Sequence, residues 1–330
     1  MSTPHVLVLT GDGDRHAERV GDLLVERGAR VTVFDHRYYP AKAHVELAYT
    51  GRGLARRLLH TETGTLDLSA LTALWWRRPL PPAPHPELTD PAVAEYTAQE
   101  SLSLVSDLWE HLPCRKVPAA ESVFRPAGRK SSQLLLAAEL GFTIPETLIT
   151  TQAEQLWDFH ARHDGKIVTK PFYAPWVENL RNGDTVSRFC EPVSPRDLAY
   201  ADALRFCPII VQEQIPKRVE LRVTVVGRQI FAVEIHSQAS NRSRLDWRRY
   251  NLDVTPHRVH RLPDEVAARC LSMMKRLGLL FGAFDLILTP EGEYVFLEIN
   301  PLGQWLWIED LTGLPISQAV CDLLLEGPGA

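Results

Sequence analysis

The sequence predicts an α/β fold whose C-terminal half has an α+β arrangement, and three observations carry this prediction. Two short apolar runs, HVLVLT at 5–10 and RVTVFDH at 30–36, are typical of buried strands. The segment between them, GDGDRHAERVGDLLVERGA, indicates a loop and a helix that ends near Gly28. In the C-terminal half, two hairpin patterns at 219–238 and 282–300 indicate strands that are adjacent in sequence.

Composition and charge are those of an ordinary globular chain. The chain has 330 residues, of which 45% are hydrophobic and 23% are charged, and this length suits two or three domains. The formal charge of -5 argues against general nucleic-acid binding, and no apolar run is long enough to span a membrane. The five cysteines are scattered without CxxC pairs, which is typical of cytoplasmic proteins without a zinc site.

The remaining elements follow from apolar periodicity. We expect strands over 71–79, 143–150, 166–172 and 207–217, and helices over 91–112, 131–141, 153–165 and 264–280. The Pro- and Arg-rich segment 114–129 is expected to be a domain junction. Residues 172–185 are expected to form a mobile loop that closes over a site.

The last predicted strand, YVFLEIN at 294–300, carries polar residues in an apolar run. Strand side chains alternate between faces, so Glu298 and Asn300 share one face. Val295, Leu297 and Ile299 are expected on the other face, toward a core. The polar face is therefore either a functional site or a solvated sheet surface.

The hairpin register predicts a second carboxylate at the same place. A symmetric turn centred between Glu291 and Gly292 would place Asp285 directly across from Glu298. Two facing carboxylates repel each other. A hard cation such as Mg²⁺, which prefers oxygen ligands, would remove this repulsion.

Several residues could serve a nucleotide. Lys130 precedes a predicted helix and Lys170 ends a predicted strand, so each could act as a point charge on phosphate or remain a surface lysine. The backbone of Glu213, Gln214 and Ile215 could offer the edge of adenine one donor and one acceptor.

Buried polar residues in the first C-terminal hairpin need partners. Glu220 could hold ribose hydroxyls. Arg222 lies among apolar residues in the middle of a strand, so it needs either a phosphate or acyl phosphate, or a carboxylate such as Glu234.

The charged, aromatic segment at 241–253 is too polar for a core. Its residues Asp246, Trp247 and Arg248 could form a solvated turn or grip a polar substrate. His236 and Asp246 could assist deprotonation of a nucleophile, although a lone histidine more often has a structural role.

The first loop argues against a nicotinamide cofactor. It reads Gly11-Asp12-Gly13-Asp14 and lacks the third glycine of a dinucleotide-binding fingerprint. Its two aspartates would also repel a pyrophosphate.

The order of these segments resembles that of the ATP-grasp ligases. The matching segments are Lys130, TKP at 169–171, QEQI at 212–215, ELRV at 220–223, AFDLI at 283–287 and LEINPLGQW at 297–305. The resemblance implies an N-terminal open α/β pre-ATP-grasp domain over 1–115. It also implies two α+β subdomains, over 116–211 and 212–330, that clasp ATP.

The same resemblance implies roles for single residues. Lys130 and Lys170 would contact phosphates, Glu213, Gln214 and Ile215 would hold adenine, and Glu220 would hold ribose. Asp285, Glu298 and Asn300 would bind Mg²⁺, and Arg222 would stabilise an acyl phosphate.

A narrower similarity concerns WWRRP at 75–79, SQASNRSRLDWRRY at 237–250 and EINPLGQW at 298–305. These are similar to the ATP-grasp maturases of microviridins and related graspetides. That implies activation of Asp or Glu side chains of a ribosomal precursor peptide, with leader and core, as acyl phosphates. These would then join Thr or Ser hydroxyls or Lys amines as macrocyclic ω-esters or ω-amides. It also implies a homodimer and substrate contacts by Arg77, Arg78, His236, Asp246, Trp247 and Arg248.

Two alternatives remain open at this point. One is an ATP-grasp ligase that adds free amino acids to a small molecule or to a protein C-terminus. The other is a non-catalytic ATP-binding regulatory protein, in which we would expect the metal-binding residues to be lost. Asp285, Glu298 and Asn300 are all present.

Overall fold

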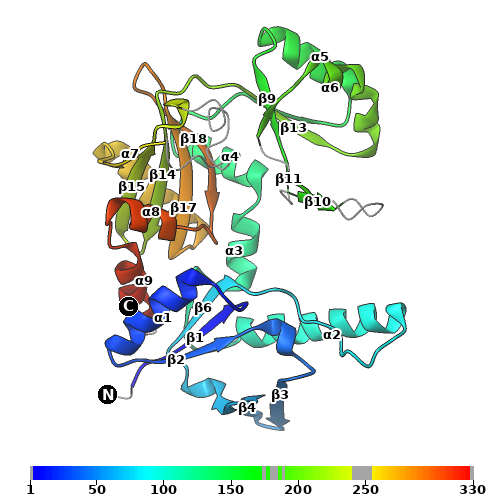
Figure 1. The fold of residues 1–330 in the computed structure, drawn as a ribbon, viewed down its shortest axis with the longest axis vertical. Coiled ribbons are helices and arrows are strands. Elements are labelled where there is room, and N and C mark those ends of the chain that lie inside the picture. The colour runs from blue at the N-terminus through cyan, green and yellow to red at the C-terminus, as the bar shows by residue number, and fades with distance from the viewer. Residues whose placement is uncertain (1–2, 173–175, 179–184, 188–189, 240–254, 328–330) are drawn as a thin grey trace.

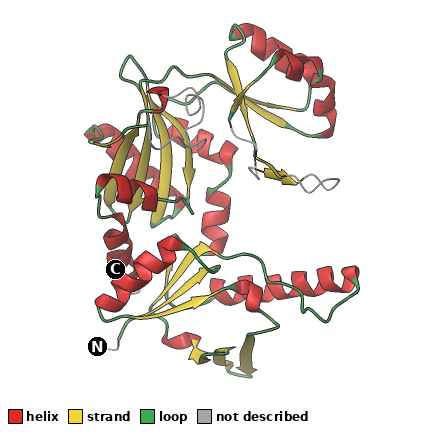
Figure 2. Cartoon of the chain, viewed as in Figure 1, coloured by secondary structure: helices red, strands yellow, loops and turns green. Residues whose placement is uncertain are grey.

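The chain folds into three lobes, which Figure 1 and Figure 2 show as separate groups of strands and helices. The computed structural model describes residues 3–172, 176–178, 185–187, 190–239 and 255–327. In the view of Figure 1 the N-terminal lobe lies at the bottom, the C-terminal lobe at the upper left and the central lobe at the upper right.

The N-terminal lobe is built on a parallel sheet in the order β2-β1-β6-β7. Its strands are β1 (His5–Thr10), β2 (Arg30–Phe34), β6 (Ala73–Arg78) and β7 (Arg115–Val117). Helices α1 (Arg15–Glu26) and α9 (Ile316–Leu325) pack on one face, and α2 (Pro91–Glu110) packs on the other. Because both faces are covered, β1 is buried along its whole length, which explains its nearly continuous apolar run.

Local signals at the ends of α1 agree with the sequence. The Asp14 carboxylate accepts the backbone N–H groups of His16 and Ala17 and so begins the helix. Gly28 follows the end of the helix with φ +81°, the conformation that glycine adopts most readily. A small antiparallel sheet that no sequence pattern above predicts belongs to the same lobe: β3 (His44–Thr50), β4 (Gly53–Thr61) and β5 (Gly64–Asp67).

The central lobe holds an antiparallel sheet in the order β12-β9-β13-β8. Its elements are β8 (Thr147–Thr150), α5 (Ala153–Arg162), β9 (Ile167–Lys170), β12 (Glu191–Pro192), α6 (Pro195–Ala199) and β13 (Ile209–Glu213). Strands β10 (Trp176–Glu178) and β11 (Thr185–Ser187) pair as a hairpin, so the loop prediction for 172–185 is wrong where these strands form. The rest of that segment, apart from Phe172, lies outside the described residues.

The C-terminal lobe holds an antiparallel sheet in the order β16-β15-β14-β17-β18. Its strands are β14 (Val219–Val226), β15 (Gln229–Ile235), β16 (His257–His260), β17 (Phe281–Leu288) and β18 (Tyr294–Asn300). The helices around it are α3 (Glu121–Ala127), α4 (Lys130–Glu139), α7 (Asp264–Leu277) and α8 (Leu306–Thr312). One face of the sheet packs on α4 and α7, and the opposite face carries the polar side chains of β14 and β17.

Short 3-10 helices complete the described chain, at His36–Tyr38, Leu68–Ala70, Ala201–Phe206 and Ser237–Ala239. None of the helices in the described ranges is both long and apolar enough to cross a membrane. The three-domain division stays a prediction. Its two limits, 115/116 and 211/212, fall inside β7 and β13, and α9 returns to pack against the N-terminal lobe.

The β17–β18 hairpin reaches the predicted pairing by an unexpected route. Asp285 pairs with Glu298, as predicted, but Leu286 pairs with Phe296, so Leu297 is the extra residue of a bulge. The turn is one residue shorter than a symmetric turn centred between Glu291 and Gly292 would be, and the bulge restores the register beyond it.

The bulge also changes which face of the sheet some side chains of β18 occupy. Phe296 and Ile299 lie in the core, whereas Leu297 lines a pocket on the opposite side. Val295 pairs with Ile287, another residue of that pocket, so it shares the pocket face as well. The prediction is wrong for Leu297, which faces the pocket because one inserted residue reverses the alternation, whereas Val295 is buried, with 1% of its surface exposed.

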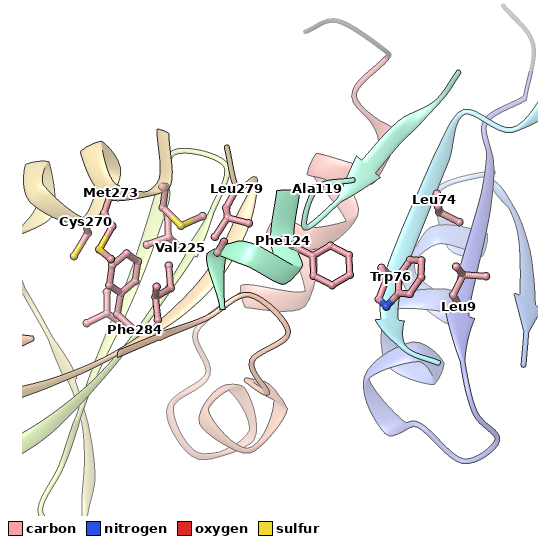
Figure 3. Packing of buried hydrophobic residues seen from close by; sticks show 14 of the residues in the cluster. Leu9, Leu74, Trp76, Ala119, Phe124, Val225, Cys270, Met273, Leu279 and Phe284 are labelled. Carbon is pink, nitrogen blue, oxygen red and sulfur yellow. The ribbon is translucent and has the colours of Figure 1, made fainter. Parts of the chain in front are cut away.

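Two hydrophobic clusters run from the N-terminal lobe into the C-terminal lobe. In the first, Trp76 of β6 meets Phe124 of α3 with ring centroids 5.4 Å apart, and the cluster continues to Phe284, as Figure 3 shows. In the second, Trp75 packs near Trp305, and the cluster includes α1 and α9. The two lobes are thus joined by shared cores, while the central lobe has a cluster of its own around α5.

The buried His36 links stability to pH. The Trp109 indole N–H donates to His36 Nε2 at 2.8 Å, and burial lowers the pKa of His36 to about 4. Above about pH 6.5 this histidine is neutral in both the folded and the unfolded chain, whereas between pH 6.5 and 4 only the unfolded chain takes up the proton. We expect the free energy of unfolding to fall by about 3 kcal/mol across this interval because of His36.

Chemical denaturation at pH 7 and pH 4 measures this loss. The control is His36→Gln, whose side-chain carbonyl can still accept the indole N–H but does not titrate. Between pH 7 and pH 4 the free energy of unfolding of the variant should fall by about 3 kcal/mol less than that of the wild type. An equal loss in both proteins would contradict the assignment.

Candidate functional site

An open pocket lies between the central and C-terminal lobes. The space between its walls is about 670 Å³, part of which is open solvent. Strands β9 and β13 form one wall, and β14, β17 and β18 form the other. The lining residues are Pro145, Val168, Lys170, Cys190, Gln212, Glu213, Gln214, Ile215, Lys217, Glu220, Asp285, Ile287, Leu297 and Glu298. The pocket brings together most of the residues that the sequence predicts for a nucleotide site.

Two cations face the two predicted metal-binding carboxylates. Arg222 Nη1 lies 2.9 and 3.0 Å from the carboxylate oxygens of Asp285. Lys130 Nζ lies 3.1 Å from Glu298 Oε2. These side chains are largely buried, and buried charges are unfavourable unless they are paired. The two ion pairs therefore balance the charge of the polar sheet face.

Asn300 completes a set of oxygen donors on that face. It pairs with Ala283 in the same register as the Asp285–Glu298 pair, and its Oδ1 accepts the Leu302 N–H at 2.9 Å. Two carboxylates and one amide suit Mg²⁺ chemically. No group of three or more His, Cys, Asp and Glu side chains is arranged to hold a metal ion in the described ranges, so the amide of Asn300 is needed for a third side-chain ligand.

The loop after β18 packs closely against Arg222. Arg222 Nη2 donates to the Gln304 carbonyl at 3.2 Å. A Cβ on Gly303 would lie 2.3 Å from Ala283 Cβ and 2.9 Å from Arg222 Nη2, so only glycine fits. Gly303 was not among the predicted site residues, although it lies in the LEINPLGQW segment that indicated the site.

Helix α4 holds β18 from the outer edge of the sheet. The buried Gln133 amide donates to the carbonyls of Ile299 and Ala127, both at 2.7 Å, and its Oε1 accepts the Ile299 N–H at 3.1 Å. Because β18 is an edge strand, the Gln133 side chain supplies the backbone hydrogen bonds that a further strand would otherwise give to Ile299. Sequence reasoning missed Gln133, whose only signal is an amide within the helical segment QLLLAA.

The segment after β13 uses most of its backbone donors. The N–H groups of Glu213 and Gln214 donate to the carbonyls of Glu146 and Lys166, at 3.0 and 2.8 Å. The Glu213 carboxylate accepts the Glu146 N–H at 2.8 Å, so its side chain helps to fix the strand end. Of the backbone N–H groups of Glu213, Gln214 and Ile215, the one without a backbone acceptor among the described contacts is that of Ile215, so it can donate to a ligand in the pocket.

Further charged side chains line the same pocket. Glu220 is buried and accepts from Lys217 Nζ at 2.8 Å. Lys170 projects from the end of β9, as predicted. Lys217 was not predicted, and its proximity to Glu220, three residues later, is the signal that could have identified it.

The predicted substrate residues that the structure describes lie outside this pocket. Arg77 is buried, with Nε 3.3 Å from Asp14 Oδ2 and its guanidinium 5.7 Å from the Trp305 ring, while Arg78 is exposed at the strand end. His236 does not line the pocket, and its Nε2 lies 3.0 Å from Glu234 Oε2. Asp246, Trp247 and Arg248 lie outside the described residues.

Glu234 is not the partner of Arg222. It pairs across the sheet with Leu221 and so lies on the opposite face, where it contacts His236 and His260. Asp285, directly across from Arg222 on β17, takes that role instead.

Comparison by sequence gives one match to a family. Residues 5–123 match the MvdD pre-ATP grasp domain. No curated protein matches the sequence.

Several solved structures match nearly the whole chain. The macrocyclase MdnB from Microcystis aeruginosa MRC is 32% identical, with TM-score 0.81, and the match covers 98% of this chain and 100% of that one. The macrocyclase MdnC from the same source, bound with the precursor peptide MdnA, is 28% identical, with TM-score 0.86 and coverage of 98% and 99%. A RiPP-associated ATP-grasp ligase from Chryseobacterium gregarium, in complex with ADP and a leader and core peptide, is 28% identical, with TM-score 0.89 and coverage of 98% and 96%. The predicted ATP-grasp fold is confirmed.

The close approach at Gly303 can be tested by a single methyl group. We expect Gly303→Ala to displace the loop from Arg222 and to destabilise the fold by about 1–3 kcal/mol, the usual cost of overpacking. The matched control is Gly21→Ala within α1, where a Cβ meets nothing nearer than 3.9 Å and helix propensity favours alanine. Urea denaturation of both variants measures the difference, and equal stabilities would contradict the packing argument.

Proposed function

This chain belongs to the ATP-grasp ligases that mature ribosomal peptides, and we propose that it closes rings between side chains of a precursor peptide. It is an ATP-dependent ligase. The proposal rests on one observation above all, the meeting of Lys130, Arg222, Asp285 and Glu298 on the polar sheet face of the interlobe pocket. Membership of the family supplies the class of substrate, a peptide with a leader and a core.

In this proposal, ATP lies along the pocket. The Ile215 N–H and the carbonyls of 213–215 would serve the adenine edge, and Glu220 would hold the ribose. Lys170 would contact the phosphates from the central lobe. Lys130 would contact them from the C-terminal lobe once it parts from Glu298.

Asp285, Glu298 and Asn300 would hold Mg²⁺, since their oxygens share one face and suit a hard cation. When bound, the metal neutralises phosphate charge. In its presence Arg222 and Lys130 would exchange carboxylate contacts for phosphate contacts, because both cations lie beside the carboxylates that it would occupy.

The proposed reaction has two steps. An Asp or Glu carboxylate of the peptide attacks the γ-phosphorus of ATP, which forms an acyl phosphate and releases ADP. A Thr or Ser hydroxyl, or a Lys amine, then attacks the acyl carbon, loses its proton and releases phosphate. Each linkage removes one water from the peptide overall, and the product is an ω-ester or an ω-amide.

Arg222 would stabilise the acyl phosphate in this scheme. Its guanidinium presents several N–H donors in a fixed fork, which matches phosphate oxygens. The Gln304 carbonyl and Asp285 hold that fork in place before any substrate binds. Such preorganised charge is the main means by which an enzyme accelerates phosphoryl and acyl transfer.

The proposal predicts that the carboxylates of the site are indispensable. We expect Asp285→Asn and Glu298→Gln each to lower the rate of product formation by at least roughly a hundredfold, with the fold retained. The control is Glu265→Gln, an exposed carboxylate of α7. The measurement is the intact mass of a candidate precursor peptide after incubation with enzyme, ATP and Mg²⁺.

Each linkage should lower the peptide mass by one water, and sensitivity to mild alkali distinguishes esters from amides. ATP consumption only when free amino acids are supplied would instead favour addition of amino acids to an acceptor. Normal turnover of Asp285→Asn at limiting Mg²⁺ would refute the metal assignment.

A further inference from the structure

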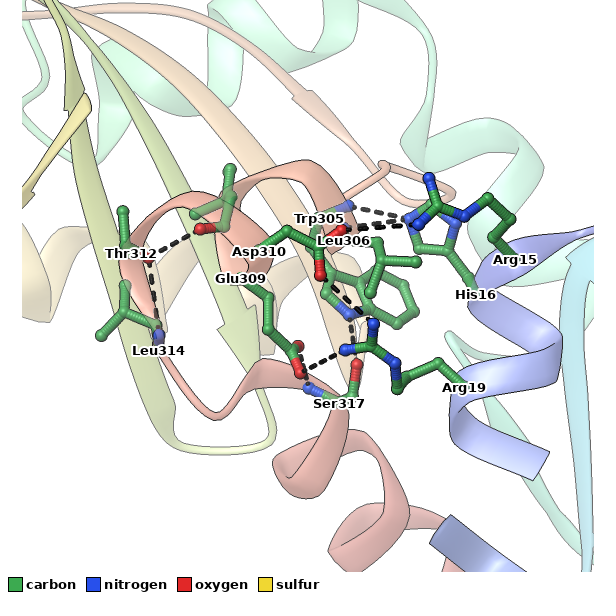
Figure 4. A network of polar contacts seen from close by, with 11 residues as sticks. Arg15, His16, Arg19, Trp305, Leu306, Glu309, Asp310, Thr312, Leu314 and Ser317 are labelled. Atoms are coloured by element: carbon green, nitrogen blue, oxygen red, sulfur yellow. Dashed lines mark hydrogen bonds and ion pairs between the residues drawn. The ribbon is translucent and has the colours of Figure 1, made fainter. Parts of the chain in front are cut away.

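One peptide group lies between the catalytic face and the N-terminal lobe. Its carbonyl, that of Gln304, accepts from Arg222 Nη2 at 3.2 Å. Its N–H, that of Trp305, donates to His16 Nε2 at 3.2 Å, and the next N–H, that of Leu306, donates to the same nitrogen at 3.1 Å. Figure 4 shows His16 reaching from α1 to these two backbone groups.

The contacts require one protonation state of His16. A nitrogen that accepts two N–H groups must keep its lone pair, so the ring proton resides on Nδ1. Nδ1 lies 3.5 Å from Asp14 Oδ1, which suits this tautomer. The ring also meets the Trp305 indole edge-on, with centroids 4.7 Å apart.

We infer that His16 is a positioning residue for Arg222, which it orients through the Gln304–Trp305 peptide group. This inference rests on the proposed function, in which Arg222 stabilises the acyl phosphate. Because the peptide unit is planar, an acceptor that fixes the Trp305 N–H also fixes the direction of the Gln304 carbonyl. The Arg222 fork is then held on one side by this carbonyl and on the other by Asp285.

Neighbouring contacts hold α1 and α8 together, so that the position of His16 is itself well defined. Arg19 pairs with Asp310 at 3.2 Å and with Glu309 at 3.7 Å. The Trp305 indole N–H donates to Ser317 Oγ at 3.1 Å. Without the His16 acceptor, two buried N–H groups would have to find other partners, and the peptide group would be free to turn.

Protonation of His16 should have the same effect as its removal. Its Nε2 would then carry a hydrogen directed at two N–H donors. Burial lowers the pKa of His16, and the charges of Arg77 and Arg78 lower it further, although the hydrogen bond and charge of Asp14 oppose this. The charged groups nearby are Asp14, Arg15 and Arg19 of α1 and its cap, Arg77 and Arg78 of β6, and Glu309 and Asp310 of α8.

The test compares His16→Gln with His16→Leu. The glutamine Oε1 falls near the place of Nε2 and can accept both N–H groups without titrating, whereas leucine keeps the volume but offers no acceptor. We expect His16→Leu to lower kcat roughly tenfold to a hundredfold with little change in KM for ATP, and His16→Gln to stay within about threefold of the wild type. As the pH falls below the ordinary histidine pKa of about 6.5, His16→Gln should also lose less activity than the wild type.

The matched control is Ser317→Ala, which removes a hydrogen bond to the Trp305 ring but leaves its peptide group untouched. It should lower stability without lowering kcat. Equal losses of kcat in His16→Gln and His16→Leu, or a normal kcat in His16→Leu, would overturn the inference.

A second readout does not depend on catalysis. Hydrogen exchange of the Trp305 and Leu306 amides should be slow in the wild type and in His16→Gln, and fast in folded His16→Leu. If the wild type protects these amides but forms no product, the proposed function is wrong, although the hydrogen bonds from these amides to His16 are confirmed. Unchanged protection in His16→Leu would overturn the contact itself.

Discussion

The ion pair between Arg222 and Asp285 is the constraint on which the rest of the site depends. Both side chains come from neighbouring central strands and are largely removed from water, where an unpaired charge would be strongly destabilising. Their pairing lets β14 and β17 carry opposite charges in the middle of a sheet whose other face, on these two strands, packs in the hydrophobic core. Lys130 and Glu298 repeat the arrangement at the sheet edge. A ligand that binds there must exchange these ion pairs for contacts of its own.

The opposite face explains why the sheet can hold such a site. Leu221 and Phe284 face α7 and the main core, while Arg222 and Asp285 alternate with them toward the pocket. Strict alternation places charge on one side without weakening the other. At β18 the bulge at Leu297 interrupts this alternation and brings Glu298 back opposite Asp285. The pocket thus depends on one extra residue in one strand.

The amino-acid sequence predicts contacts within the site correctly where the residues that meet belong to one hairpin. Strand alternation and hairpin pairing predicted that Asp285 meets Glu298, but the turn and the bulge deviate in compensating ways that a symmetric hairpin does not contain. The partner of Arg222 was predicted only as a class, because both Glu234 and Asp285 are carboxylates on strands next to β14 and only the register separates them. Gln133 binds Ile299, which is 166 positions further along the chain, and His16 binds Trp305, which is 289 positions further along. No periodicity in one chain reveals such distant contacts.

The distribution of the hydrophobic cores distinguishes the central lobe from the other two. The N-terminal and C-terminal lobes share two hydrophobic clusters, and His16 adds a polar contact that ends beside Arg222. The central lobe has its own cluster, around Leu156 and Phe159. The pocket lies between the central sheet and the C-terminal sheet. If the central lobe moved to close the pocket over a ligand, few apolar contacts between lobes would be broken. A movement that separated the N-terminal lobe from the C-terminal lobe would break many. In the first case the arginine and the carboxylates would stay fixed while Lys170 approaches, so that the charged face is organised before the pocket closes.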